Sequence, residues 1–250
     1  MENVTKIIQN RLLHIAKIVC NILTKNNIPY SLAYGTLLGA VRHNGFIPWD
    51  DDFDLWLFDD TYEYALECLR KELPDYLFVE DKLTEPKFYH EWSRIRDKNT
   101  IVHNDMYNQD NIYASKGINL DLYNLFKIRF KDLKSFLIKK NNEYLNRRFE
   151  IGNIEINEIK NKEKKLENVL DLIKFEGDIE REVYALVLFY NRKYLEISWF
   201  DKLVLKKFED ALFYIPCGFK QVLTSIYGDY NVLPPIENRN SHYDYFKLIN

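Results

Sequence analysis

Y-G-T-L-L-G-A-V-R-H-N-G-F-I-P-W-D-D-D-F-D-L-W-L-F, from Tyr34 to Phe58, is the stretch that decides how the chain is interpreted. Its second half carries four carboxylates within five positions, after a turn marked by glycine and proline: Asp50, Asp51, Asp52 and Asp54. The apolar run that follows predicts a strand over 52–58, in which side chains two positions apart share a face. Asp52 and Asp54 therefore point to the same side, while their hydrophobic neighbours point into the core.

Carboxylates crowded in this way predict a bound cation. Like charges repel one another, and removing them from water together is costly unless an opposite charge lies among them. Two carboxylates fixed side by side on a strand suit Mg²⁺, with Mn²⁺ as an alternative. For Asp50 and Asp51, which precede the strand, a solvated turn or a helix cap is the other interpretation. A second alternating segment, 117–125, supplies a third carboxylate, Asp121, among apolar neighbours.

A phosphate-binding turn is predicted just before the acidic residues. Residues 28–33 form a short apolar run, typical of a buried strand. Gly35 and Thr36 follow it directly after Tyr34. We expect Thr36 to cap a short helix that continues to Val41. Because backbone N–H groups at the start of a helix attract anions, the succession of strand, glycine turn and helix favours a phosphate site.

Two arginines lie on another predicted strand, 88–95 and its continuation. The alternation of side chains puts Arg94 and Arg96 on one face, where two guanidinium groups would hold a pyrophosphate. Ion pairing with the acidic residues of 50–81 is an equally good account of the same pattern. The sequence leaves both interpretations open.

Periodicity elsewhere predicts an α+β fold with a mixed β-sheet core flanked by helices. Helices are expected over 4–26, 62–73 and 218–227, short strands over 76–80 and 100–103, and an extended segment over 199–215. The Lys-, Asn- and Glu-rich stretch 130–195 predicts two or three helices. We expect three parts: a catalytic core over 1–129, a helical subdomain over 130–198, and a C-terminal segment over 199–250 that packs back on the core.

Composition is that of an ordinary globular protein, with 250 residues, 46% of them hydrophobic, and a net charge of −3. Residues 50–81 hold twelve acidic side chains, and 127–165 hold twelve basic against six acidic. The basic block would suit phosphates, an anionic lipid carrier or a membrane surface, although a solvated, Lys-rich helix face is the preferred interpretation. Three widely spaced cysteines predict neither a disulfide framework nor a zinc site. We expect a cytoplasmic protein, with the inner face of the membrane as an alternative location.

The motifs together resemble a known family. Gly35-Thr36, the D-x-D strand and the distant Asp121 resemble the nucleotidyltransferase-fold signature. G-T-L-L-G-A-V-R-H-N-G-F-I-P-W-D-D-D-F-D is similar, more specifically, to the hallmark of the LicD family, which includes bacterial phosphocholine transferases and is similar to the fukutin group. The resemblance extends to R-I-R-D-K-N-T at 94–100 and to Y-G-D-Y-N-V-L-P-P at 227–235.

The resemblance implies transfer of phosphocholine from CDP-choline to a hydroxyl of a surface glycan, with release of CMP. The acceptor would be lipopolysaccharide, capsule, a teichoic acid precursor or a lipid-linked oligosaccharide. Other CDP-activated alcohol phosphates, such as ribitol or glycerol phosphate, and a true nucleotide transfer remain alternatives. A non-catalytic calcium-binding protein is disfavoured, because the acidic run lacks the ligand spacing and glycine of a calcium loop. No basic patch interleaved with aromatics lies near the acidic strand, so nucleic acid is not an expected partner.

The same resemblance implies roles for individual residues. Asp52, Asp54 and Asp121 would hold the metal, and Gly35 and Thr36 would meet the phosphates. Asp121 or Asp51 would accept the proton of the hydroxyl, and Asp50 and Asp51 would either accept a proton or support the metal ligands from behind. Arg42, with Arg94 or Arg96, would bind the diphosphate or the leaving CMP. The quaternary ammonium would meet an aromatic cage, for which core packing is the alternative account: Trp49, Trp56, Tyr89 and Trp92.

Overall fold

A mixed β-sheet forms the centre of the computed structural model, which describes residues 4–103, 112–171, 173–174, 177–187 and 194–249. Its strands lie in the order β1-β2-β6-β4-β3. They span Tyr30–Leu32, Asp54–Phe58, Asn119–Arg129, Ser93–Asp97 and Leu77–Glu80 respectively. β2 and β6 run parallel, and the other neighbours along this path are antiparallel. The predicted α+β fold with a mixed sheet is confirmed.

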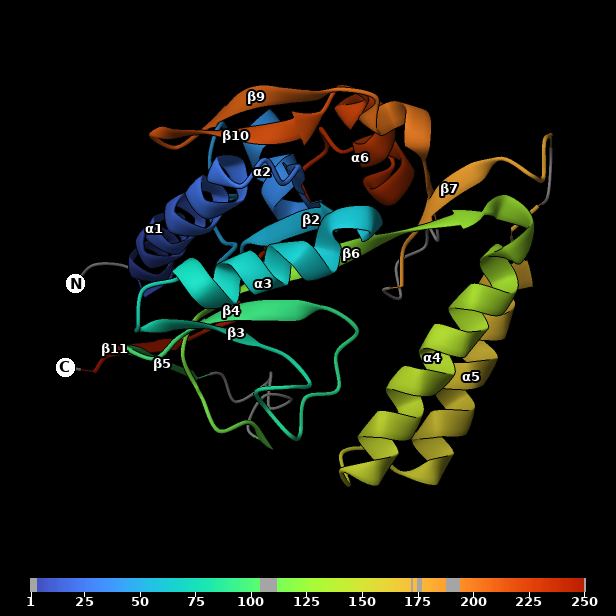
Figure 1. Cartoon of the computed structure of the whole chain (residues 1–250), viewed down its shortest axis with the longest axis horizontal. Helices are drawn as coiled ribbons and strands as arrows, with labels where there is room; N and C mark the ends of the chain where they lie inside the picture. Colours follow the sequence, from blue (N-terminus) through green and yellow to red (C-terminus); the bar gives the residue numbers. More distant parts are fainter. Residues whose placement is uncertain (1–3, 104–111, 172, 175–176, 188–193, 250) are drawn as a thin grey trace.

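Helices enclose the sheet because their apolar faces join one core. α1 (Val4–Lys25) buries residues three and four positions apart, and it packs against α3 (Tyr62–Glu72). α2 (Tyr34–Arg42) connects β1 to the turn that carries Asp50, Asp51 and Asp52, hereafter the acidic turn. The hairpin β9–β10 (Leu203–Phe208 and Ala211–Pro216) lies beside β1, next to α6 (Phe219–Tyr227) (Figure 1). These C-terminal elements share the hydrophobic core of the N-terminal sheet.

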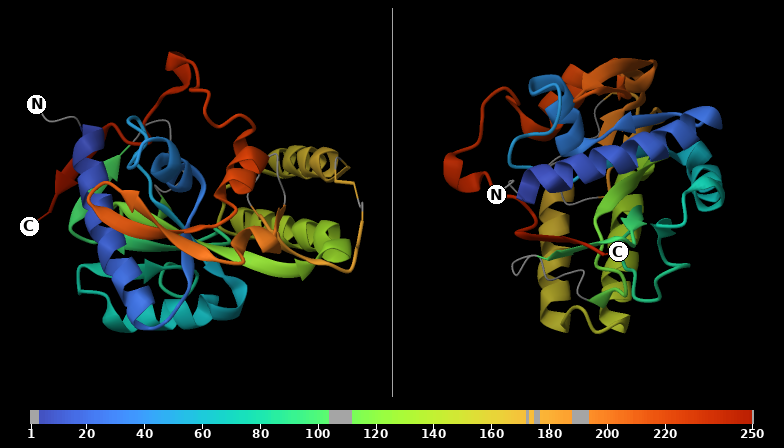
Figure 2. Two further views of the ribbon diagram at one scale, coloured as in Figure 1. Left: turned by 90° about the horizontal axis from the view of Figure 1, so that it is seen from above. Right: turned by 90° about the vertical axis from the view of Figure 1, so that its left-hand side faces the viewer.

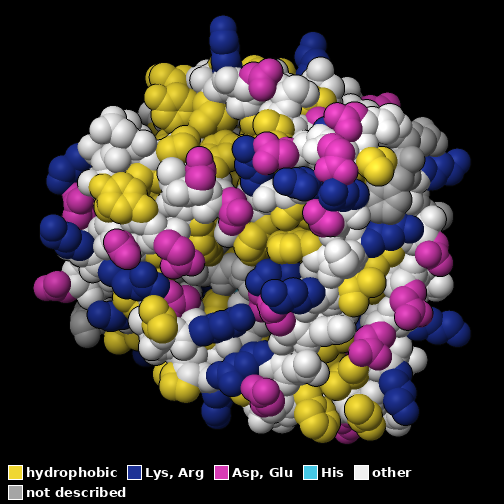
Figure 3. All heavy atoms as spheres, turned by 45° about the vertical axis from the view of Figure 1, so that its right-hand side comes forward, with side chains coloured by type: hydrophobic (Ala, Val, Ile, Leu, Met, Phe, Trp, Pro, Cys, Tyr) yellow, Lys and Arg dark blue, Asp and Glu magenta, His cyan; other side chains and the backbone are white. Residues whose placement is uncertain are grey.

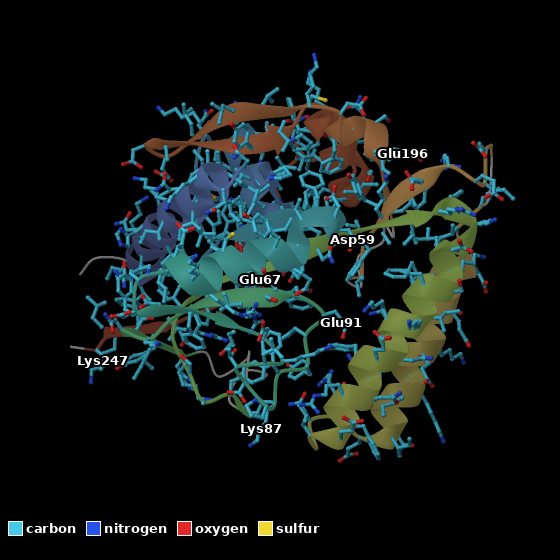
Figure 4. The ribbon with its side chains drawn as sticks, viewed as in Figure 1. Asp59, Glu67, Lys87, Glu91, Glu196 and Lys247 are labelled. Atoms are coloured by element: carbon cyan, nitrogen blue, oxygen red, sulfur yellow. The ribbon has the colours of Figure 1, made fainter. Side chains whose placement is uncertain are left out.

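An arm of two helices projects from the far end of β6. α4 (Leu133–Glu150) and α5 (Ile156–Asp171) lie side by side and extend away from the sheet (Figure 2). Glu91, in the loop before β4, faces this arm (Figure 4), and its carboxylate lies 3.2 Å from the Lys140 ammonium of α4. Figure 3 shows acidic and basic side chains interspersed on the face that carries the arm. That mixture favours a solvated surface for the basic block.

The predicted helical stretch 130–195 is correct for the arm and wrong beyond it. The two helices are separated by residues 151–155. After the arm, however, the chain forms β7 (Glu182–Ala185) and β8 (Tyr194–Glu196). β6 runs four residues past the predicted end of its strand, and β7 pairs with that extension. The division at 129/130 and 198/199 stays a prediction.

Smaller differences from the predicted elements concern the site. β2 begins at Asp54, so Asp52 precedes the strand instead of opening it. β4 begins at Ser93, which leaves most of the predicted strand 88–95 in a loop. β11 (Tyr245–Leu248), which the sequence did not predict, pairs with β5 (Thr100–His103). Within the described part of the chain, no helix is both long and apolar enough to cross a bilayer.

Candidate active site

The acidic turn between α2 and β2 is fixed by a helix that is distant in sequence. Gln9 of α1 donates hydrogen bonds from its side-chain amide to the Ile47 and Asp50 carbonyl oxygens, at 3.2 and 2.7 Å. Gly35, in the first turn of α2, faces the turn so closely that a Cβ there would lie 2.8 Å from Asp50 Oδ2. The absence of a side chain at residue 35 therefore lets the carboxylate approach the backbone of α2.

Three carboxylates here have raised pKa values: Asp50 and Asp52 in the turn, and Asp54 at the start of β2. Burial raises the pKa of Asp54 well above its ordinary value, and the charges of Asp52 and Asp121 raise it further. The pKa of Asp50 is also raised well above its ordinary value, first by burial and then by Asp52. Burial likewise raises the pKa of Asp52, whose Oδ1 is buried and has no hydrogen-bond partner among the described residues. A divalent cation fits this donor set, because it would compensate the charges and meet the unpartnered oxygen.

Asp121 lies beside Asp54 because β2 and β6 are parallel neighbours in which these two residues are register partners. Its two oxygens accept hydrogen bonds of 2.7–3.1 Å from three side chains, Asn119, Trp92 and Tyr123. The Arg94 guanidinium forms an ion pair with the same carboxylate, with Nε 3.1 Å from Oδ1. These contacts hold the carboxylate in one orientation. Asp121 and Asp54 thus lie at one end of the parallel strand pair, and Asp52 is close enough for its charge to raise the pKa of Asp54. Among the described residues, the ligand atoms that lie within 4.8 Å of one another belong to Asp50, Asp52 and His242. That Asp52, Asp54 and Asp121 hold one metal stays a prediction.

The prediction that Thr36 caps α2 is wrong. The helix begins at Tyr34 with Ala33 as its N-cap, and no side chain caps it. The Thr36 hydroxyl instead accepts a hydrogen bond from the Asp54 backbone N–H at 2.9 Å, which ties α2 to β2. Gly35 and Thr36 nevertheless lie in the first turn, where backbone N–H groups have no partner within the helix. Arg42 lies about 10 Å further along the helix axis, where it donates to the Tyr230 carbonyl.

The two arginines of β4 differ in their surroundings. Arg96 is 1% exposed and forms a buried ion pair with Glu80, and it also donates to the Gly117 carbonyl and to Asn119. The ion-pairing interpretation therefore applies to Arg96, and its geometry favours a role in the fold over one in donor binding. Arg94 is nearly buried too, but its partner is Asp121. Of the pair, Arg94 lies at the acidic site.

The four aromatics proposed for a cage lie in different environments. Trp92 reaches Asp121 and packs against Tyr123, with ring centroids 5.0 Å apart. Trp49 lies under the Arg239 guanidinium, 4.9 Å from the ring centroid. Tyr89 and Trp56 are both fully buried, so core packing accounts for them. Of these side chains, Trp92 is the one that borders the carboxylates.

His242 belongs to the site although no motif in the sequence indicated it. Asp51, which is 1% exposed, accepts hydrogen bonds from the His242 N–H (2.7 Å), the Tyr243 N–H (2.9 Å) and the His242 ring (2.9 Å). The bond to Asp51 raises the pKa of His242 to about 9. With both oxygens engaged, Asp51 is better explained as an anchor for the C-terminal segment than as a proton acceptor. A lone histidine 190 residues downstream carries no pattern that would have predicted this contact.

Comparison with known proteins identifies the region around the site. Residues 27–144 match the family model described as LicD/FKTN/FKRP, nucleotidyltransferase domain. The chain carries a LicD family domain. The LicD match includes the acidic turn and Asp121, and it ends before His242.

Individual relatives extend the similarity. The lipopolysaccharide cholinephosphotransferase LicD of Haemophilus influenzae is 27% identical over 238 residues, covering 86% of this chain and 87% of that protein. An uncharacterized protein of Rickettsia typhi is 31% identical over 126 residues, 46% of this chain and 38% of its own. A second, from Rickettsia prowazekii, is 50% identical over 48 residues, 19% of this chain and 18% of its own. Similarity to the first of these relatives therefore runs well beyond the LicD domain.

Proposed function

We propose that this protein transfers phosphocholine from CDP-choline to a hydroxyl of lipopolysaccharide and releases CMP. The observation that carries the proposal is the similarity to the Haemophilus influenzae cholinephosphotransferase over most of both chains. The acidic turn and Asp121 support it, since they form a donor set suited to a cation. We propose further that the reaction takes place in the cytoplasm, at the inner face of the membrane when the acceptor is lipid-linked.

The reaction joins the acceptor hydroxyl oxygen to the phosphorus of phosphocholine. The bond from that phosphorus to the bridging oxygen breaks, CMP leaves with the electron pair, and the hydroxyl proton passes to a carboxylate. Such transfers depend on positioning and charge compensation more than on covalent chemistry. Mg²⁺, or Mn²⁺ in its place, would be held by Asp52, Asp54 and Asp121 and would supply charge neutralisation at the diphosphate.

The chain's own groups supply the remaining tasks. Backbone N–H groups around Gly35 and Thr36, at the start of α2, would bind donor phosphate oxygens. Arg94, fixed against Asp121, adds a positive charge on the same side of the sheet. Asp50 is the carboxylate we propose as proton acceptor, through Oδ2, the oxygen that lies close to Gly35. Asp51 has both oxygens engaged and is no longer proposed for that task.

For the choline group, we propose the paired rings of Trp92 and Tyr123. They lie against one another beside Asp121, and an aromatic face attracts a quaternary ammonium through its negative quadrupole. The carboxylate edge would add an electrostatic attraction. Trp49, another of the four residues predicted for a cage, remains a second candidate and directly precedes Asp50 in the acidic turn.

A donor panel tests the proposed function. Purified protein with Mg²⁺ and lipopolysaccharide is supplied in turn with CDP-choline, CDP-ribitol and CDP-glycerol, and CMP release is measured. We expect release with CDP-choline that depends on the acceptor. Release with either polyol donor but none with CDP-choline would replace phosphocholine by the alternative alcohol phosphate.

A further inference from the structure

His242 stands next to two carboxylates of the acidic turn. Its Nδ1 lies 3.8 Å from Asp50 Oδ1 and 3.9 Å from Asp52 Oδ2. One ligand atom from each of these three residues falls within 4.8 Å of the other two. Ligands of one cation at about 2.1 Å are separated by about 3.0–3.4 Å. The two distances from His242 would have to shorten by about 0.4–0.9 Å for these atoms to surround a single ion.

The fold holds His242 in this position from both sides. Asp51 binds the backbone N–H groups of residues 242 and 243, and β11 begins three residues after the histidine and pairs with β5. The Tyr243 hydroxyl also donates to Asn119, which in turn donates to Asp121. The segment 239–249, hereafter the C-terminal strap, is thus fastened to the same carboxylates and strands that form the proposed metal site.

One oxygen of Asp52 has no hydrogen-bond partner in the part of the chain that the structure describes, which supports a cation bound by this carboxylate. Asp52 Oδ1 is buried without a hydrogen-bond partner among the described residues, although the side chain as a whole is 38% exposed. Its other oxygen, Oδ2, is the one that faces His242. A buried carboxylate oxygen without a donor is costly, and a cation would satisfy it. Asp52 thus has Oδ2 facing His242 and a second oxygen, unpartnered within the described ranges, that remains open to another cation.

We propose that Asp50, Asp52 and His242 form a second cation position, which shares Asp52 with the position assigned to Asp52, Asp54 and Asp121. The proposal rests on the proposed function for that neighbouring ion. A ligand set of two carboxylates and an imidazole suits transition-metal cations such as Mn²⁺ better than Mg²⁺, because imidazole prefers softer ions. The ion would take the place of the ring proton that faces Asp51; that proton would be released to solvent, so binding should strengthen as the pH rises. Asp51 keeps both of its backbone N–H donors.

The proposal has a consequence for the strap. A cation bound by His242 joins the end of the chain to the acidic turn through a metal–ligand bond as well as through Asp51. Since binding to the native arrangement alone stabilises it by mass action, Mn²⁺ should fasten the strap. Mg²⁺, held by oxygen ligands, should do so much less.

Pulsed electron paramagnetic resonance of bound Mn²⁺ tests the proposal without an activity measurement. The full chain is loaded with Mn²⁺ at two equivalents, and the echo modulation is recorded for natural-abundance protein and for protein labelled with ¹⁵N in histidine only. A directly bound imidazole gives strong nitrogen modulation, whose frequencies change on labelling. His242→Gln is expected to lose this modulation and to weaken binding of the second Mn²⁺ by at least about tenfold. His14→Gln, an exposed histidine of α1, is the matched control and should keep both.

The outcomes separate the two proposals. Labelling-sensitive modulation in the wild type that His242→Gln abolishes supports the second position. Its absence from wild-type protein that binds Mn²⁺ overturns the position, even if transferase activity is normal, and no variant has to fold for that result. Modulation that persists in His242→Gln overturns it as well, because the nitrogen would come from another histidine. If the wild type neither binds Mn²⁺ nor releases CMP, the proposed metal-dependent function is overturned, and this position with it.

Discussion

Replacing Asp51 by asparagine should release the C-terminal strap while leaving the rest of the fold in place. The asparagine oxygen can still accept the two bonds from His242, but without a negative charge. The amide that replaces Oδ2 faces the Tyr243 N–H, so a donor meets a donor. Hydrogen bonds to charged groups contribute about 1.5–3 kcal/mol and neutral ones about 0.5–1.5 kcal/mol. Two weakened bonds and one lost bond then give roughly 4 kcal/mol.

Hydrogen exchange of the strap measures this loss directly. A change of about 1.4 kcal/mol is tenfold, so the opening equilibrium of residues 242–248 should rise by about 10² to 10³. Global stability in urea should fall by less, because the strap can detach without unfolding the sheet. Asp244→Asn is the matched control, since Asp244 is an exposed carboxylate of the same strap. Unchanged exchange in Asp51→Asn, or an equal rise in Asp244→Asn, would refute the anchoring role of Asp51.

Two further substitutions separate the site from the fold. Gly35→Ala places a Cβ 2.8 Å from Asp50 Oδ2, so kcat/KM for CMP release should fall by at least about tenfold. The urea midpoint should change little. A marked fall in the urea midpoint together with the fall in kcat/KM would indicate a purely structural effect. Arg96→Met leaves Glu80 buried without its ion pair, which should cost about 3–5 kcal/mol of unfolding free energy in urea. A loss below about 1 kcal/mol would show that the pair is solvated, as surface pairs are.

Local patterns explain why much of the fold could be predicted. The three- and four-residue spacing of α1 and α3 and the alternation around Asp121 appear in consecutive residues, and each matches the structure. The metal candidates were also visible locally, because carboxylates beside apolar strand residues carry a cost that core packing does not explain. Asp54 and Asp121 became neighbours through a parallel pairing that their two alternating segments allowed.

The remaining features depend on contacts between distant residues. β7 forms because the end of β6 offers an unpaired edge, and the sequence 182–185 does not reveal that partner. Thr36 has the chemistry of a helix cap, yet the N–H of Asp54 takes its hydroxyl after the chain has turned back. His242 reaches the acidic turn through the pairing of β11 with β5, which joins segments about 140 residues apart. Propensity rules act within a few residues and do not register such contacts.

Transfer of phosphocholine by this protein should depend on a metal held at the acidic turn. The most direct measurement follows phosphocholine incorporated into lipopolysaccharide from CDP-choline, with Mg²⁺ or with EDTA, for the wild type, Asp54→Asn and Asp60→Asn. Asp60 is an exposed carboxylate beyond the other end of β2 and serves as the control. We expect incorporation by the wild type and Asp60→Asn with Mg²⁺, none with EDTA, and none by a folded Asp54→Asn protein. Full incorporation by Asp54→Asn, or by the wild type in EDTA, would contradict the claim.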